Sequence, residues 1–237
     1  MDRGRKVKIA GIIPARKGSK GITNKNMLEL NGKPLIQYTI EESLKSKLDE
    51  IYLTTDDKNI IDFCKGFYKE IKIPFIRPDH LSSDSSEAID VAIHLLSHLK
   101  SNDNFPDFIC WLQPTSPLRT FLDINNCIDL INNDKSIESV ISVVKIENNH
   151  PYKMKLIDDN ETLIPFINQN LKSTNRQNLP EVYIPNGAIF LINTNKLIEK
   201  MNFYGDKSIP YRMSIDNSVN IDSKMDFLLA ELLLIKK

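Results

Sequence analysis

The segment from residue 14 to residue 26 concentrates groups that bind a polyphosphate. It follows an apolar run from Val7 to Ile13, and loops that leave such buried strands lie at the ligand-binding edge of an α/β sheet. Basic side chains supply charge, glycines allow close approach of the backbone, and hydroxyls donate hydrogen bonds. These groups belong to Arg16, Lys17, Lys20, Lys25, Gly18, Gly21, Ser19 and Thr23. The alternative is a solvated basic loop, but the preceding strand favours a phosphate site.

A second polar cluster occupies residues 112–119, with the sequence Leu-Gln-Pro-Thr-Ser-Pro-Leu-Arg. Its two prolines restrict the chain to a turn after an apolar strand, which holds amide, hydroxyl and guanidinium groups at the edge of the sheet. An ordinary proline-rich connector is the alternative for this segment taken alone.

Apolar runs alternate with helical patterns along most of the chain, which predicts an α/β fold. The expected strands are 9–14, 51–55, 73–76, 108–112, 139–145 and 187–192, and the expected helices are 34–47, 58–68, 85–99, 123–132 and 225–235. Right-handed crossovers place the loops after parallel strands on one edge, so Arg16, Asp56 and Gln113 are expected to converge.

The rhythm breaks between residues 146 and 183, a polar stretch without long helical periodicity. We therefore expect an insertion at 146–183, with residues 1–145 and 184–237 forming the main domain.

Composition excludes several classes of protein. The 31 basic and 31 acidic residues balance, so no global charge favours nucleic acid or an anionic membrane. Three widely spaced cysteines argue for reduced thiols, and neither a signal-type segment nor a long apolar run is present. We expect a soluble cytoplasmic protein.

The loop at 14–26 matches neither the Walker A pattern nor the dinucleotide-binding Gly-x-Gly-x-x-Gly fingerprint. It resembles the first signature of the acylneuraminate (CMP-sialic acid) cytidylyltransferases: Ile-Pro-Ala-Arg at 13–16, Ser19-Lys20 and Lys25-Asn26. Residues 112–119 match the family's second signature without a departure. Residues 176–180 and 185–190 resemble the third, and the motifs occur in family order over nearly the whole chain.

This resemblance implies a Rossmann-like, three-layer nucleotidyltransferase with a mostly parallel sheet, in which the insertion at 146–183 makes a homodimer. It also implies the reaction, in which CTP and a nonulosonate sugar give the CMP-sugar and pyrophosphate. The anomeric hydroxyl attacks the α-phosphorus while Arg16, Lys20 and Lys25 offset the phosphate charge.

The resemblance assigns Ser19, Asn26 and Arg77 to CTP. A fixed guanidinium at Arg77 suits cytosine, which presents acceptors at O2 and N3, whereas uracil carries a donor at N3.

For the sugar, the resemblance implies Gln113, Thr115, Asn186 and Phe190, together with Arg176 contributed across the dimer to the sugar carboxylate. Phe190 stands where tyrosine is usual, and Ile184 where some family members carry arginine; both departures bear on the choice of sugar.

The segment Asn220-Ile221-Asp222 resembles the family's Asp-x-Asp motif for Mg²⁺, with asparagine at the first position. An amide oxygen attracts Mg²⁺ less than a carboxylate does, and Asp216 is a candidate to compensate. Asp56 is another possible ligand, although a helix cap by Asp56 or Asp57 is favoured. His94 and His98 have metal-capable spacing, but no acid lies in a ligand register, and a surface or core position is favoured.

Three alternatives stay open at this point. The sugar acid is N-acylneuraminate, legionaminate, pseudaminate, an 8-amino acid or an octulosonate, with the first two favoured. A nucleotidyltransferase for a sugar 1-phosphate is a different class, and a non-enzymatic nucleotide-binding protein is a third.

Overall fold

The structure is a computed structural model that describes residues 6–18, 21–167 and 179–236. Six strands form one sheet in the order β10-β6-β9-β5-β1-β4, in which only β9 runs antiparallel to its neighbours. The strands of this sheet are β1 (Ile9–Pro14), β4 (Glu50–Thr54), β5 (Phe108–Trp111), β6 (Ser139–Lys145), β9 (Tyr183–Asn193) and β10 (Ser208–Met213). The expectation of an α/β fold with a mostly parallel sheet is confirmed.

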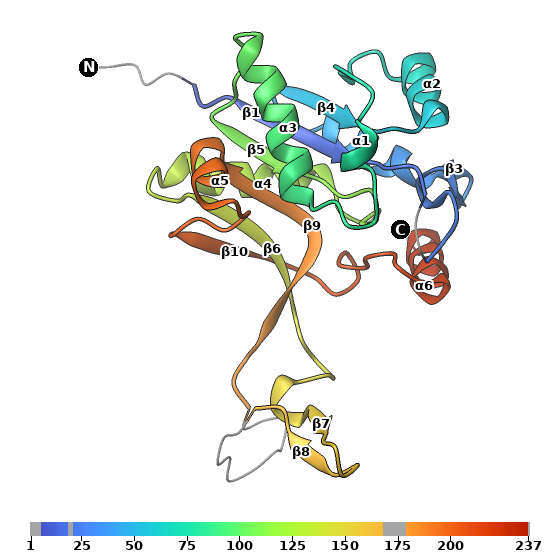
Figure 1. Ribbon diagram of the computed structural model, residues 1–237, viewed down its shortest axis with the longest axis vertical. Coiled ribbons are helices and arrows are strands. Elements are labelled where there is room, and N and C mark those ends of the chain that lie inside the picture. The colour runs from blue at the N-terminus through green and yellow to red at the C-terminus, as the bar shows by residue number, and fades with distance from the viewer. Residues whose placement is uncertain (1–5, 19–20, 168–178, 237) are drawn as a thin grey trace.

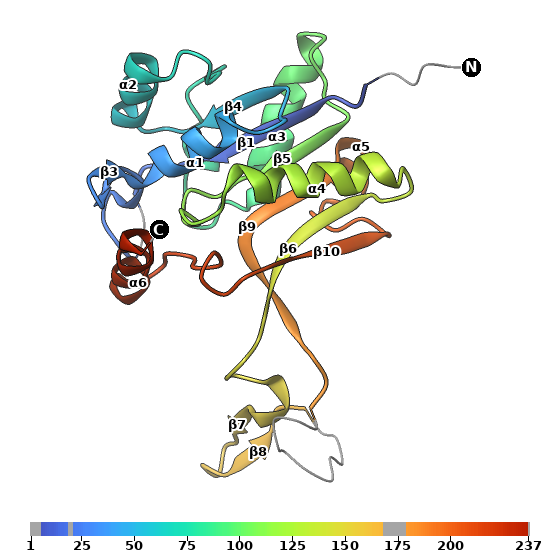
Figure 2. The ribbon, with the colours of Figure 1, turned by 180° about the vertical axis from the view of Figure 1, so that it is seen from behind.

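Helices cover both faces of this sheet (Figures 1 and 2). They are α1 (Leu35–Leu44), α2 (Lys58–Phe67), α3 (Ala88–Ser101), α4 (Phe121–Asn133) and α5 (Thr194–Lys200). A further helix, α6 (Lys224–Ile235), lies beside the sheet and packs in a separate cluster with Leu30 and Leu35 (Figure 1). Because side chains alternate along a strand, β1 sends Ile9 and Ile13 into a core with α1, α2 and α4. Ala10 and Ile12 face the opposite core, formed with α3 and α5.

Two details of the sheet differ from the sequence-based expectation. The strand expected at 73–76 is wrong: Lys72 makes an isolated bridge to Tyr52, and Pro74 has no N–H with which to continue a ladder. The edge strand β10 was not expected, since it contains Pro210. An edge strand tolerates proline because only one of its sides pairs.

The described residues 146–167 and 179–182 lie outside the sheet, at the end of a long ribbon. β6 and β9 continue their antiparallel pairing to Lys145 and Tyr183 and project away from the layers (Figure 1). Beyond them, β7 (Lys155–Ile157) and β8 (Leu163–Pro165) form a hairpin in which every residue of the two strands is exposed. We refer to residues 146–182 as the arm.

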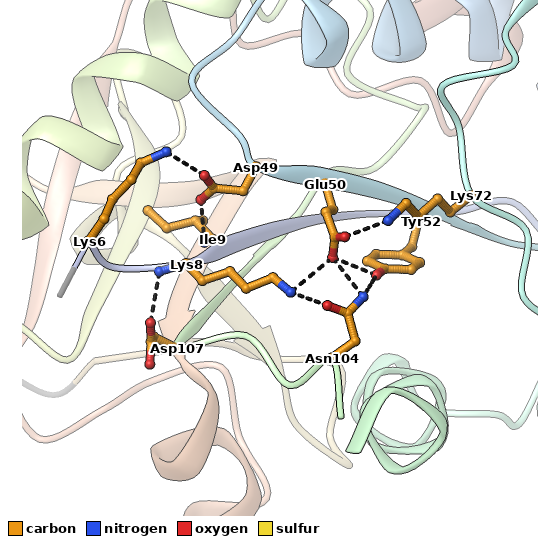
Figure 3. Close-up of polar contacts among 9 residues, drawn as sticks. All are labelled: Lys6, Lys8, Ile9, Asp49, Glu50, Tyr52, Lys72, Asn104 and Asp107. Carbon is orange, nitrogen blue, oxygen red and sulfur yellow. Dashed lines mark hydrogen bonds and ion pairs between the residues drawn. The ribbon is translucent and has the colours of Figure 1, made fainter. Parts of the chain in front are cut away.

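At the amino ends of β1 and β4, a polar network joins neighbouring strands (Figure 3). Glu50 accepts hydrogen bonds from Tyr52, at 2.7 Å, and from Lys72, and Asn104 contacts both Glu50 and Tyr52. Burial opposes ionisation of Glu50, yet the hydrogen bonds from Lys72, Tyr52, Asn104 and Lys8 hold its pKa at about 2. This network stabilises the end of the sheet opposite the loops that follow the strands.

No helix in the described part of the chain is long and apolar enough to cross a membrane.

Candidate functional site

A cavity of about 570 Å³ lies at the carboxyl ends of the parallel strands. Four segments line it: the loop after β1, the segment from Arg77 to Val91 in α3, the turn after β5, and the stretch before α6. Their lining residues include Arg16, Gly21, Lys25, Asn26, Arg77, Gln113, Thr115, Asn220 and Asp222. The expected convergence of Arg16 and Gln113 is therefore present. Ser19, Lys20 and Arg176 lie outside the described residues.

The loop after β1 is held by one hydrogen bond within the loop and by two carboxylates from outside it. Asn26 is 9% exposed, and its Nδ2 donates to the Arg16 carbonyl at 3.2 Å, which ties the two ends of the loop together. Asp56 accepts from the Lys17 N–H at 2.7 Å, and Arg16 Nη2 pairs with Asp84 Oδ1 at 2.6 Å. Asp56 therefore anchors this loop, while the neighbouring Asp57 caps α2 by accepting from the Asn59 N–H.

Lys25 connects the same loop to the stretch before α6. Its Nζ donates to the Ile221 carbonyl at 2.7 Å and to Asp222 Oδ1 at 3.2 Å. Gly21 approaches the same stretch so closely that a Cβ there would lie 2.2 Å from the Asp222 carbonyl oxygen. A cation, a backbone carbonyl oxygen and a carboxylate oxygen thus meet where the loop after β1 touches residues 221–222.

Asn220 and Asp222 are the two candidate oxygen ligands for a hard divalent cation at this edge of the cavity. Asn220 Nδ2 donates to Asp222 Oδ2 at 3.2 Å, whereas the buried Asn220 Oδ1 has no hydrogen-bond partner among the described residues. Such an acceptor without a partner suits Mg²⁺, which prefers oxygen ligands. No group of three or more His, Cys, Asp or Glu in the described ranges could hold a metal by itself, so phosphate oxygens would have to complete the coordination.

Arg77 is a buried cation at the floor of the cavity, with only 4% of its surface exposed. Its Nε donates to Thr54 Oγ1 at 3.1 Å and its Nη2 to the Thr54 carbonyl at 2.5 Å, so the end of β4 fixes the guanidinium plane. Burial lowers the pKa of Arg77 to about 10, against the opposing influence of Asp56, and the group stays charged at neutral pH.

The turn after β5 brings Gln113 and Thr115 to the cavity. The Thr115 carbonyl accepts from the Ile221 N–H at 2.8 Å, which connects this turn to the segment that carries Asp222. Gly187 of β9 has φ +77°, and a Cβ there would lie 2.7 Å from Gln113 Oε1. The backbone of β9 therefore lies directly against the Gln113 side chain.

Asn186 and Phe190 of β9 are not among the residues that line the cavity. Asn186 is buried and shapes the strand: its Oδ1 accepts from Ser142 Oγ at 2.6 Å and from the Ala188 N–H at 3.1 Å. Phe190 packs on Phe203, with ring centroids 5.6 Å apart, and Phe203 in turn packs on Trp111, which does line the cavity. Direct sugar contacts by Asn186 and Phe190 stay predictions.

Sequence reasoning missed the place of one residue, Arg119, and favoured the structural role that His94 and His98 have. Arg119, expected at the edge of the sheet, is 1% exposed and turns into the protein. His94 and His98 both pack edge-on against Phe75, which agrees with the structural interpretation favoured for them. The sequence carries no local signal for the direction of Arg119, because its carbonyl partner on β9 is 69 residues away.

Comparisons with known proteins agree with this geometry. A family model described as "Cytidylyltransferase" matches residues 10–234. The chain is 35% identical over 227 residues to the N-acylneuraminate cytidylyltransferase of Escherichia coli, covering 95% of this chain and 52% of that protein. It is 34% identical to the CMP-N,N'-diacetyllegionaminic acid synthase of Legionella pneumophila, covering 96% and 97% of the two chains. It spans about half the length of the E. coli and Streptococcus agalactiae relatives that it matches.

Solved structures show the same fold at lower sequence identity. A CMP:2-keto-3-deoxy-manno-octonic acid synthetase complexed with CTP has a TM-score of 0.70 at 15% identity, covering 97% of this chain and 99% of that chain. A 4-diphosphocytidyl-2C-methyl-D-erythritol synthase from Anaerococcus prevotii has a TM-score of 0.65 at 16% identity, with the same coverage. Because the family model matches nearly the whole chain, this chain belongs to the cytidylyltransferase family.

Proposed function

We propose that this protein transfers CMP from CTP to the anomeric hydroxyl of a sialic-acid-like nonulosonate and releases pyrophosphate. The observation that carries the proposal is the meeting of the loop after β1, Arg77, Gln113 and the 220–222 segment in one cavity. In this arrangement the loop after β1 would bind the triphosphate, the fixed guanidinium of Arg77 the base, and the polar groups of the turn after β5 the sugar. The printed names of the E. coli and L. pneumophila relatives support this assignment.

Catalysis in this arrangement depends on position and charge. Arg16, Lys20 and Lys25 offset the negative charge of the phosphates as the sugar hydroxyl attacks the α-phosphorus in line and pyrophosphate leaves. Ser19 and Asn26 hold the nucleotide, and Arg77 selects cytosine through its O2 and N3 acceptors. No covalent intermediate on the protein is needed.

Asp222 and Asn220 would hold a magnesium ion, and we propose Mg²⁺ as the cofactor on the fit of their oxygens. When bound, Mg²⁺ neutralises charge on the phosphate oxygens of CTP. Lys25 already contacts Asp222 Oδ1, so this carboxylate is positioned before any ligand binds.

The sugar end of the cavity is assigned to Gln113 and Thr115, with Asn186 and Phe190 shaping β9 behind them. Relatives named for N-acylneuraminate, for N,N'-diacetyllegionaminic acid and for pseudaminic acid are 35%, 34% and 29% identical to this chain, respectively. We propose an N-acylneuraminate or legionaminate substrate, with pseudaminate next.

We also propose a homodimer in which the arm of one subunit reaches the site of its partner and contributes Arg176. The exposed hairpin supports this, since Ile157 and Leu163 are 72% and 67% exposed on an element with no core of its own. The three free, buried cysteines fit a reducing compartment, and we propose the cytoplasm.

The test of the proposed reaction is pyrophosphate release from CTP with a panel of nonulosonates and, separately, with sugar 1-phosphates. Lys25→Ala should lower turnover by about two to three orders of magnitude, because it removes one fixed charge from the phosphates. Lys17→Ala is the matched control, since Lys17 is exposed on the same loop and does not line the cavity. Turnover of sugar 1-phosphates alone, or equal activity in both lysine variants, would contradict the assignment.

The test of the dimer mixes Arg176→Ala subunits with Lys25→Ala subunits, each inactive alone. If Arg176 acts across the interface, random pairing restores up to about a quarter of the parental activity, because one site in each mixed dimer is intact. No recovery after demonstrated subunit exchange would place Arg176 in its own chain's site.

A further inference from the structure

Arg119 is a fully buried cation whose partners are neutral oxygens. Its Nη1 donates to the carbonyls of Ala188 at 2.7 Å and Gln113 at 3.2 Å, and its Nη2 donates to Thr39 Oγ1 at 2.7 Å. None of the described carboxylates lies within ion-pair distance of it, although Asp123 and Glu42 favour its charge from farther away, and its buried Nε has no hydrogen-bond partner in the described ranges. Burying a charge without a partner of opposite sign in direct contact is strongly unfavourable, so its retention calls for an explanation beyond packing.

The guanidinium lies at the point where two strands part. β5 and β9 pair from Phe108↔Asn193 to Trp111↔Phe190, where the ladder ends. Continuing that register would set Gln113 opposite Ala188, and these are the two residues whose carbonyls Arg119 bonds. Arg119 therefore joins the strands beyond the end of the ladder, at the residue whose side chain reaches the cavity.

The opposite side of β9 is fixed by a separate set of contacts. The register between β6 and β9 shifts between Ile141 and Val143, and Ser142 in this irregularity bonds the Asn186 side chain and the Ile189 N–H. The shift presents Gly187, whose absent Cβ leaves room for Gln113 Oε1. Arg119 thus fixes the main chain of Gln113 through its carbonyl, and the Gly187 backbone limits the position of its side chain.

We propose that Arg119 is a positioning residue that sets the Gln113 side chain for the sugar substrate, a role that rests on the proposed function. The reason for arginine is geometric, since a planar fork donates to several oxygens at fixed angles and no apolar side chain does so. Arg119 itself touches neither the sugar nor the nucleotide.

The experiment compares Arg119→Met, Arg119→Lys and Gly187→Ala with the parent, measuring KM and kcat for the sugar and for CTP together with Tm. We expect Arg119→Met to lower kcat/KM for the sugar by about ten- to hundredfold, with KM for CTP within about twofold. Arg119→Lys retains the charge and one or two donors and should recover part of the loss. Gly187→Ala, which pushes a Cβ against Gln113 and strains the backbone at φ +77° without changing the Arg119 side chain, should give the same split between the substrates.

Thr194→Val is the matched control. Thr194 is 1% exposed, its Oγ1 also has no hydrogen-bond partner in the described ranges, and it starts α5 at the other end of β9. It should leave both KM values unchanged. Equal losses for CTP and sugar, or a folded Arg119→Met with parental sugar kinetics, would overturn the proposal.

If Arg119→Met does not fold, the proposal is tested with Arg119→Lys and Gly187→Ala, which should also lower kcat/KM for the sugar while leaving KM for CTP unchanged. A parent inactive with every nonulosonate would instead refute the proposed function. The positioning role is then decided by crystal structures, since an unmoved Gln113 in Arg119→Lys and Gly187→Ala would refute it.

Discussion

Gly21 lies against the backbone of Asp222, and this contact predicts a large effect for a single methyl group. In Gly21→Ala the new Cβ would lie 2.2 Å from the Asp222 carbonyl oxygen, and real Cβ atoms do not approach closer than 3.0 Å. The loop or residues 221–222 must therefore move by about 0.8 Å or more, because the obstacle is backbone rather than a flexible side chain. That movement separates the groups that Lys25 joins.

A displacement of about 1 Å in positioned catalytic groups costs on the order of a hundredfold in rate, or about 2.7 kcal/mol of transition-state stabilisation. We expect this loss in kcat/KM for pyrophosphate release by Gly21→Ala. The change in Tm should be small, since Gly21 is exposed and outside the cores.

The matched control is Gly66→Ala in α2, where an added Cβ meets nothing within 4 Å. It should retain full activity and gain about 0.5–1 kcal/mol of stability, because alanine is the better helix former. If Gly21→Ala is folded and as active as Gly66→Ala, the close approach of the loop to Asp222 is not part of the active conformation, and the reasoning fails.

Three further predictions follow from the site and from the opposite end of the sheet. Arg77→Ala should reduce the preference for CTP over UTP, measured as the ratio of kcat/KM values, by about tenfold or more, because it removes fixed donors to the base; an unchanged ratio would exclude Arg77 from base recognition. Asn220→Asp should lower the Mg²⁺ concentration for half-maximal activity, because a carboxylate attracts Mg²⁺ more strongly than an amide oxygen; an unchanged Mg²⁺ titration would place the metal elsewhere. Glu50→Gln should lower the free energy of unfolding near pH 7 by about 1–2 kcal/mol, less than the full pKa shift would imply because the carboxylate is partly exposed. Because the pKa of Glu50 is lower in the folded state than its usual 4.5, this contribution is present above about pH 4.5 and disappears as pH falls towards 2. Urea unfolding near pH 7 and near pH 3 should therefore show a difference between parent and Glu50→Gln that shrinks in acid, and a constant difference would contradict the assignment.

Local patterns predicted most elements of the main sheet and its helices because those signals are carried by neighbouring residues. Apolar runs located β1, β4, β5 and β6, and Thr120 and Ser223 begin α4 and α6 with capping boxes. The same reasoning failed at residues 73–76 and at β10. At 73–76 an apolar run predicted a strand, but Pro74 cannot continue a ladder. In β10 Pro210 argued against a strand, but its place at the edge of the sheet tolerates proline.

Resemblance to the family's signatures predicted that the loop after β1, Arg77, Gln113 and the 220–222 segment belong to one site. Their side chains reach a shared cavity because crossovers bring the ends of separate strands to one edge of the sheet. Asp56 shows the difference: composition left metal ligand and helix cap open, and its contact with Lys17 shows instead that it anchors a loop.

What the sequence determined by itself is therefore the kind of chemistry, since residue types and their spacing within single segments specify which ligands they can bind. Tertiary structure alone decided which way Arg119 points, that β9 runs against its neighbours, and that Gly187 meets Gln113. The physical reason is that each of these contacts joins segments separated by tens of residues, and their geometry comes from strand register and side-chain burial rather than from any local preference of the chain.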